Sequence, residues 1–256
     1  MSESVGELRV DGIAKQYALK GGWGAEACLD VFSDISFTLS GGEFVSLIGP
    51  SGCGKTTVLN LAAGLDRPSA GAIYVDGRKV VGPGLDRGVV FQEFALFPWL
   101  TVAENIAFGL KSQGVPKAER RQLVAKYVEL VGLSNFSHYY PNRLSGGMRQ
   151  RVGLGRAFAI DPAVLLMDEP FGALDTQNRE AMQNALGEIW LRARKTVLFV
   201  THDIREAIYL SDRVLVISGR PSRIVLDLPI ALPRPRIRRT REFQELELQL
   251  EQAIGQ

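Results

Sequence analysis

A glycine-rich loop over Gly49–Thr56 constrains the fold of this chain more than any other segment. It follows the short, apolar, β-rich segment Phe44–Ile48, and apolar residues resume at helical spacing over Val58–Ala63. The loop fits the pattern G-x-x-x-x-G-K-[ST] in the strand, loop, helix context that this pattern requires. In such a loop the backbone N–H groups turn inward around a phosphate, and the helix N-terminus adds a positive dipole end. The segment therefore predicts a phosphate-binding loop.

The loop also predicts roles for individual side chains. We expect Lys55 to reach the β- and γ-phosphate oxygens of ATP, and the Thr56 hydroxyl to ligate Mg²⁺. ATP and Mg²⁺ are thus the expected ligands. The nucleotide-binding residues expected here are Gly49, Pro50, Ser51, Gly52, Cys53, Gly54, Lys55, Thr56 and Thr57.

Two further segments, Val164–Met167 and Thr196–Val200, are apolar at every position. Strands buried on both faces belong to a parallel sheet that helices cover. Other short segments are bounded by Gly and Asp or alternate in polarity, which is typical of antiparallel strands. These segments are Leu8–Val10, Ile35–Leu39 and Ile73–Val75.

From Thr101 to Ile160 the pattern becomes helical, most clearly over Glu119–Val131. We predict an α/β fold: a P-loop NTPase (RecA-like) core with an antiparallel β layer and an inserted α-helical subdomain. The expected division is 1–100 for the β layer and first part of the core, and 101–160 for the helical subdomain. The second part of the core is expected over 161–225 and a C-terminal tail over 226–256.

Composition excludes several classes of protein. Apolar residues make up 46% and charged residues 23%, as in an ordinary globular protein. Lys and Arg exceed Asp and Glu by only 30 to 28, so no strong field favours nucleic acid, and none is expected as a partner. Cys28 and Cys53 match no metal spacing or disulfide framework, which favours a reducing compartment. Met1–Asp11 lacks the apolar core of a signal peptide, and no apolar run reaches membrane-spanning length.

Asp168 and Glu169 place two carboxylates directly after the apolar segment Val164–Met167. Two acids after an apolar strand are often only a strand end. The carboxyl ends of parallel strands, however, form the ligand crevice of such sheets. Beside a phosphate loop, we therefore expect Asp168 to hold Mg²⁺, and Glu169 to orient and deprotonate the attacking water.

The segment Leu144–Arg151, sequence LSGGMRQR, narrows the prediction to one family. It resembles the signature motif of ABC-transporter ATPases, although Met148 stands where Gln is usual. The resemblance implies that Ser145, Gly146 and Gly147 bind the γ-phosphate of ATP held by the other subunit of a dimer. A helix N-terminus with two glycines is a suitable anion site, because its free backbone N–H groups and the helix dipole favour negative charge. This property is consistent with the implied role.

Other family motifs follow in order along the chain. Gln92 resembles the glutamine that joins the Mg²⁺ and water site to the helical subdomain, and Asp175, in Ala173–Asp175, resembles part of the D-loop. His202 resembles the switch histidine that contacts the γ-phosphate. The implied catalytic residues are Glu169, His202, Gln92 and Lys55, and the implied metal ligands are Thr56, Gln92 and Asp168.

For three further features, the sequence allows two interpretations each. Tyr17 fits the aromatic residue that stacks on adenine in this family, and Trp23 is the alternative. Phe94–Trp99 belongs either to the core or to a groove that docks a helix of a membrane subunit. The thiol of Cys53 is either inert or has its pKa depressed by the anion-binding loop.

Two remaining features favour simple structural interpretations. His138 lies beside two tyrosines and a proline, where a structural role is expected. The basic segment Arg234–Arg241 and the polar segment Glu242–Ile254 predict a solvated tail that ends in a small docked helix. The alternative for this tail is a regulatory contact with an anion.

The resemblance covers about Leu8 to Pro235, and two strings, Gly82–Val89 and Phe97–Val102, look like the importer branch for nitrate, sulfonate, taurine and related compounds. It implies an ATP-hydrolysing subunit at the cytoplasmic face of the inner membrane. The implied partners are a second copy in a head-to-tail homodimer, integral membrane permease subunits and, indirectly, an extracytoplasmic substrate-binding protein. The alternative is a soluble ABC-type ATPase that acts on nucleic acid or ribosomes.

Overall fold

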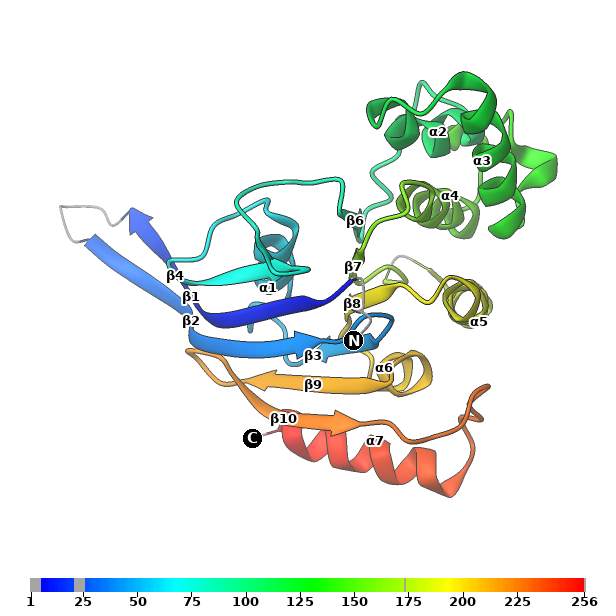
Figure 1. Cartoon of the computed structure of the whole chain (residues 1–256). Helices are drawn as coiled ribbons and strands as arrows, with labels where there is room; N and C mark the ends of the chain where they lie inside the picture. Colours follow the sequence, from blue (N-terminus) through cyan, green and yellow to red (C-terminus); the bar gives the residue numbers. More distant parts are fainter. Residues whose placement is uncertain (1–5, 21–25, 173, 256) are drawn as a thin grey trace, which may run out of the picture. The chain divides into compact units, whose positions relative to one another are not determined.

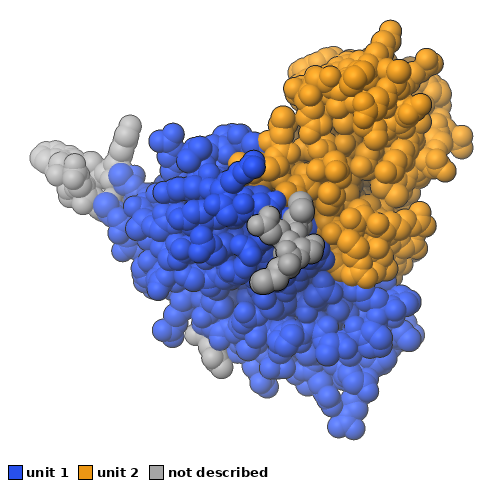
Figure 2. All heavy atoms as spheres, viewed as in Figure 1, with its two compact units in different colours: residues 1–84, 196–256 blue, residues 85–195 orange. Residues whose placement is uncertain are grey.

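The computed structural model describes residues 6–20, 26–172 and 174–255. The chain forms two compact units, shown in different colours in Figure 2. The first unit contains residues 1–84 and 196–256, and the second contains residues 85–195. The phosphate loop lies in the first unit, whereas the Asp168–Glu169 pair and the signature segment lie in the second.

An antiparallel sheet forms one layer of the first unit, as predicted (Figure 1). Its strands are β1 (Leu8–Lys20), β2 (Glu26–Leu39), β4 (Ala70–Val75) and β5 (Arg78–Lys79), in the order β2-β1-β4-β5. The first two strands are longer than the sequence pattern indicated. Shifts in the β1–β2 register between Val10 and Gln16 interrupt the alternation of apolar residues, so pattern alone detects only part of each strand.

A second sheet of this unit carries the phosphate loop. Its strands run in the order β10-β9-β3-β8, with β3 (Phe44–Ile48) parallel to both β8 (Thr196–Val200) and β9 (Arg213–Ser218). The edge strand β10 (Arg223–Pro229) is antiparallel to β9. Every residue of β3 and β8 is buried, which confirms the prediction from their uniformly apolar sequences. Helices α1 (Lys55–Ala63) and α6 (Ile204–Leu210) follow β3 and β8 along the chain.

The C-terminal segment is only partly the solvated tail that its polarity predicts. Helix α7 (Arg241–Ile254) begins with Thr240 as its N-cap and lies along β9 and β10 (Figure 1). Phe243 and Leu250 of this helix are completely buried, and Arg236 before it is buried as well. The docked helix is confirmed. Most of the basic segment before it is exposed or half-buried, but Arg236 is buried because backbone carbonyls satisfy its guanidinium.

The second unit combines two parallel strands, β6 (Arg87–Val90) and β7 (Val164–Asp168), with helices. The helices are α2 (Val102–Ser112), α3 (Lys117–Leu130), α4 (Gly146–Ala159) and α5 (Thr176–Ala193), with 3-10 turns at Ser134–Phe136 and Pro141–Arg143. Helix α2 begins at a capping box between Thr101 and Glu104. The helical segment is therefore present as predicted, while the boundaries at 101 and 160 remain a prediction.

Candidate nucleotide-binding site

The phosphate loop is assembled around the ammonium group of Lys55. Its Nζ donates to the carbonyl oxygens of Gly49, at 2.8 Å, and Pro50, at 3.0 Å, and only 6% of the residue is exposed. Gly52 and Gly54 adopt left-handed backbone conformations, with φ of 76° and 93°. The positively charged Lys55 side chain thus lies inside the loop that the sequence predicts to bind phosphates.

Neighbouring side chains of the loop differ in accessibility. Pro50, Ser51, Gly52 and Thr56 are exposed, whereas Cys53 is buried. Burial raises the pKa of the Cys53 thiol, so less thiolate forms near neutral pH. The structure therefore favours the inert interpretation of Cys53 over a depressed thiol pKa.

Sequence reasoning missed an arginine that lies against the loop. A Cβ placed on Gly52 would lie 2.8 Å from Nη2 of Arg220. Gly52 and Arg220 also line a small cavity of about 80 Å³ together with Leu29, Asp30 and Val31. No motif marks Arg220, because the turn between β9 and β10 brings it to the loop only in the folded chain.

The strand register places His202 close to the same sheet edge as the loop. Leu47 of β3 pairs with Val200 of the parallel strand β8, and Gly49 and His202 each follow two residues later. His202 is exposed. Next to it, Thr201 donates its hydroxyl proton to Oε2 of Glu206 at 2.7 Å, and Thr201 Oγ1 accepts from the N–H of Asp203 at 3.0 Å.

Tyr17, expected to stack on adenine, lies in β1, and the residue is 40% exposed. Its hydroxyl donates to Oδ2 of Asp66 at 3.0 Å, and Nζ of Lys15 lies 4.7 Å from the ring centroid. Burial, followed by the hydrogen bond and charge of Asp66, raises the pKa of the Tyr17 hydroxyl. The alternative, Trp23, lies outside the described residues, so stacking by Tyr17 stays a prediction.

In the second unit, the two carboxylates lie at the end of β7 as predicted. Asp168 is the last residue of the strand and is buried, and Glu169 follows it with a left-handed φ of 40°. A glutamate in this region stores backbone strain, a feature that clusters at functional sites. A Cβ placed on Gly172 would lie 3.4 Å from Nε2 of Gln92 and 3.8 Å from Oε2 of Glu169, so both side chains approach one glycine.

The signature residues form the start of helix α4. Ser145 is exposed and is the N-cap, and its Oγ accepts from the N–H of Met148 at 3.2 Å. Gly146 and Gly147 form the first helical turn. This is the helix N-terminus that the resemblance assigned to a phosphate.

Asp175 is the N-cap of helix α5, as Ser145 is the N-cap of α4. Its carboxylate accepts from the N–H of Asn178 at 3.1 Å and from Nδ2 of the same residue at 2.6 Å. These hydrogen bonds lower the pKa of the Asp175 carboxyl. Ala173, the first residue of the expected D-loop string, lies outside the described residues.

Phe94–Trp99 forms an exposed segment rather than core. Trp99 is 70% exposed and packs against Phe97, whose ring centroid lies 4.3 Å from that of Phe108 in α2. Helix α4 holds the same segment, because Nη1 of Arg156 donates to the carbonyl of Ala95 at 2.6 Å. The structure thus favours the surface interpretation of this segment.

A phosphate loop, a strand ending in Asp-Glu and a capped glycine-rich helix start define the class of P-loop ATPases. The family model described as ABC transporter matches residues 32–172, more than half of the chain. This chain therefore belongs to the ABC transporter family, as an ATP-binding subunit that hydrolyses ATP to ADP and phosphate.

Individual relatives cover most of the chain. A nitrate import ATP-binding protein from Synechocystis sp. is 50% identical over 210 residues, which are 82% of this chain and 79% of that protein. An aliphatic sulfonates import ATP-binding protein from Bacillus cereus is 44% identical over 241 residues, 93% and 92% of the two chains.

Among solved structures, a dimeric ATP-binding cassette in a post-hydrolysis state with ADP and Pi superimposes with a TM-score of 0.74 at 30% identity. The match covers 88% of this chain and 100% of the other. This likeness confirms the predicted fold class. Within the described residues, no helix combines the length and apolar character needed to cross a bilayer.

Proposed function

We propose that this chain is the ATP-hydrolysing subunit of an ABC importer for a small compound such as nitrate, a sulfonate or taurine. The observation that supports the transport function is the similarity to import ATP-binding proteins, which covers 82% and 93% of this chain for the two relatives above. The chain would act at the cytoplasmic face of the membrane, attached to separate permease subunits. The phosphate loop, preassembled around Lys55, supports the ATPase part.

In the proposed reaction, Lys55 offsets negative charge on the β- and γ-phosphates, and His202 contacts the γ-phosphate from the end of β8. Glu169 orients a water molecule and accepts its proton as the water oxygen attacks the γ-phosphorus. The bond between that phosphorus and the bridging oxygen of ADP breaks, which releases phosphate. Gln92 lies beside the same glycine as Glu169 and links this site to the segment Phe94–Trp99.

Mg²⁺ fits the donor set on this chain. The Thr56 hydroxyl, the Gln92 amide oxygen and the Asp168 carboxylate are hard oxygen donors, which Mg²⁺ prefers, and it usually completes its coordination with phosphate oxygens and water. We infer that these three residues hold the ion. When bound, Mg²⁺ supplies positive charge that stabilises the charge developing on the phosphates.

The second copy of the chain would complete the site. Ser145, Gly146 and Gly147 would present a helix N-terminus to the γ-phosphate of the ATP bound by the other subunit, and Asp175 would lie between the two sites. The dimeric state of the solved relative supports this arrangement. Closure on ATP would drive the permease, and hydrolysis would release it.

Replacing Glu169 with Gln tests the catalytic assignment. We expect E169Q to bind ATP as the parent chain does but to lose at least about a hundredfold in turnover, because general-base catalysis contributes roughly 10²–10⁴ in rate. ATPase assays together with fluorescent-nucleotide titration measure the two effects. The matched control is E180Q on the exposed surface of α5, which should keep full turnover. Undiminished hydrolysis by E169Q would remove Glu169 as the base.

A further inference from the structure

Helix α6 determines where the backbone around His202 lies. It is only seven residues long, too short to be stable without packing. Its N-cap Asp203 accepts from the N–H groups of Arg205, at 2.8 Å, and Glu206, at 3.2 Å. Glu206 in turn accepts the hydroxyl proton of Thr201. Both chain neighbours of His202 are therefore bonded directly to this helix.

The other end of α6 is capped by a buried arginine from the C-terminal segment. Arg236 donates to the carbonyls of Ile208, Tyr209 and Ser211, the last groups of the helix and its C-cap. It also donates to the carbonyls of Ile230 and Leu232. Burial lowers the pKa of Arg236 to about 10, so the group remains charged near neutral pH. A cation at a helix C-terminus is favourable, and here it satisfies carbonyls that the helix itself leaves unpaired.

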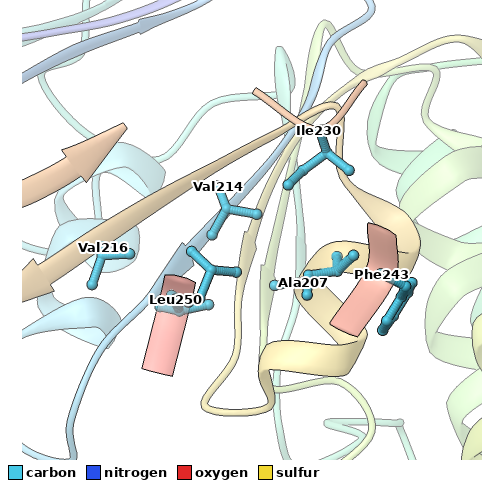
Figure 3. Close-up of a cluster of buried hydrophobic side chains, with 8 residues drawn as sticks. Ala207, Val214, Val216, Ile230, Phe243 and Leu250 are labelled. Atoms are coloured by element: carbon cyan, nitrogen blue, oxygen red, sulfur yellow. The ribbon is translucent and has the colours of Figure 1, made fainter. Parts of the chain in front are cut away.

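Helix α7 holds the outer side of α6. Figure 3 shows Phe243 and Leu250 of α7 converging with Ala207 of α6 and Val214 of β9 in one buried cluster. At the surface, Nε of Arg205 in α6 pairs with Oε1 of Glu247 in α7. The guanidinium of Arg238 lies 3.7 Å from the ring centroid of Tyr209, the penultimate residue of α6.

We propose that residues 230–254 form a clamp on α6 that positions His202 for the γ-phosphate, with Arg236 and Glu247 as its positioning residues. This inference rests on the proposed function, in which His202 contacts that phosphate. The clamp touches no nucleotide itself. It restrains the short helix α6 in addition to the packing of that helix on β3 and β9. The hydrogen bonds through Thr201, Asp203 and Glu206 pass that constraint to His202.

A loosened clamp should change the rate of the chemical step more than nucleotide binding. Ile48, directly before the phosphate loop, packs in the same buried cluster as α6 and α7. The hydrogen bonds of Lys55 to Gly49 and Pro50, however, involve neither Arg236 nor Glu247, so KM for ATP should change less than kcat. A displacement of about 1 Å at a reacting group can cost up to roughly a hundredfold in rate. We expect kcat to fall by about tenfold in R236M. In E247Q, which removes the ion pair between the half-buried Glu247 and the exposed Arg205, we expect a fall of about two- to threefold.

The C-terminal helix offers matched controls for both substitutions. Arg241 and Glu245 pair with each other within α7, so R241M and E245Q change the same charges without affecting a contact to α6. These two variants should keep the parent kcat. Circular dichroism and thermal melting show whether R236M folds. If it does not, comparing kcat of E247Q with kcat of E245Q in the full-length chain tests the clamp instead.

A double-mutant cycle separates positioning from general destabilisation. If the clamp acts through His202, R236M and E247Q should lower kcat in the parent chain but cause little further loss in an H202A background. An equal fold-loss in both backgrounds, or a parent-like kcat in R236M and E247Q, would refute the clamp while the proposed function stands. Full turnover by H202A would overturn the assignment of His202 and the clamp with it.

Discussion

At the scale of single residues, Gly54 shows why the phosphate loop depends on glycine. It precedes helix α1 with a left-handed φ of 93°. A Cβ placed there would lie 2.5 Å from Cγ1 of Val31 and 3.2 Å from Cδ1 of Phe32, both in β2. Strand β2 and the loop therefore approach too closely for any side chain at this position.

Comparing two glycines separates backbone strain from this close approach. Gly77, in the turn between β4 and β5, also has a left-handed φ, of 73°, but a Cβ there would meet no atom within 4 Å. Alanine should cost roughly 1–2 kcal/mol of backbone strain at either position. We expect only G54A to weaken ATP binding as well, by at least about tenfold, because the loop must shift to relieve the contact. Isothermal titration calorimetry checks this, and equal affinities for G54A and G77A would contradict it.

At the scale of elements, helices α2 and α4 together hold the segment Phe94–Trp99. Asn105 of α2 is fully buried, accepts from the N–H of Phe97 at 2.9 Å and donates to the carbonyls of Phe97, Leu100 and Thr101. From α4, Arg156 binds the carbonyl of Ala95, which has a left-handed φ of 43°. This fixed segment presents the exposed ring of Trp99, and the signature residue Ser145 is the N-cap of α4. A partner that docks there would touch a segment that is hydrogen-bonded to the helix carrying the signature.

Trp99 tests whether this segment docks the permease. An exposed tryptophan adds little to folding, but aromatic residues often dominate binding at interfaces. We expect W99A to keep its basal ATPase activity and to lose most of its co-purification with a permease and of the stimulation that the permease causes. L248A, which truncates an exposed apolar residue of α7, is the control and should still bind the permease. Full stimulation of W99A would exclude this docking role.

At the scale of the whole molecule, the proposed catalytic groups are divided between the two compact units and, in the dimer, between two copies of the chain. The first unit supplies the phosphate loop and His202, and the second supplies Gln92, Asp168, Glu169 and the signature residues. Because of this division, we expect ATP turnover to require the dimer. ATP affinity should depend mainly on the phosphate loop of a single subunit. Lys55 should therefore bind ATP in a monomer but support hydrolysis only in a dimer.

Mixing two inactive variants tests the composite site. K55A disables the phosphate loop, and S145R disables the signature, so neither homodimer should hydrolyse ATP. In a mixed dimer, one site combines both defects, but the other combines an intact loop with an intact signature. With free exchange at equal amounts and independent sites, half of the dimers are mixed, so the expected recovery is about a quarter of parent activity. ATPase assays of the mixture measure this recovery, and its absence despite demonstrated mixed dimers would contradict the head-to-tail arrangement.

The local sequence was sufficient to predict a structural element or a site wherever that feature depends on consecutive residues. A few consecutive residues are enough to predict three kinds of element. These elements are the phosphate loop, the buried strands β3, β7 and β8, and the capped start of α4. Glu169 could be predicted from its place directly after a buried strand, whereas the role expected for Ser145 comes from the resemblance of its segment to the family signature. The full length of β1 and β2 could not be predicted, because irregular pairing between distant strands breaks the simple alternation of polarity.

Only the tertiary structure decided the roles of residues whose partners are distant in sequence. Arg220 reaches Gly52 across the first unit, and Arg236 is buried against the carbonyl end of α6 although its neighbours predicted a solvated tail. A buried guanidinium is favourable only when carbonyls satisfy it, and composition cannot reveal where such carbonyls lie. The sequence alone therefore determined the family and the residues expected to bind and hydrolyse ATP, whereas long-range packing determined what holds these residues in place.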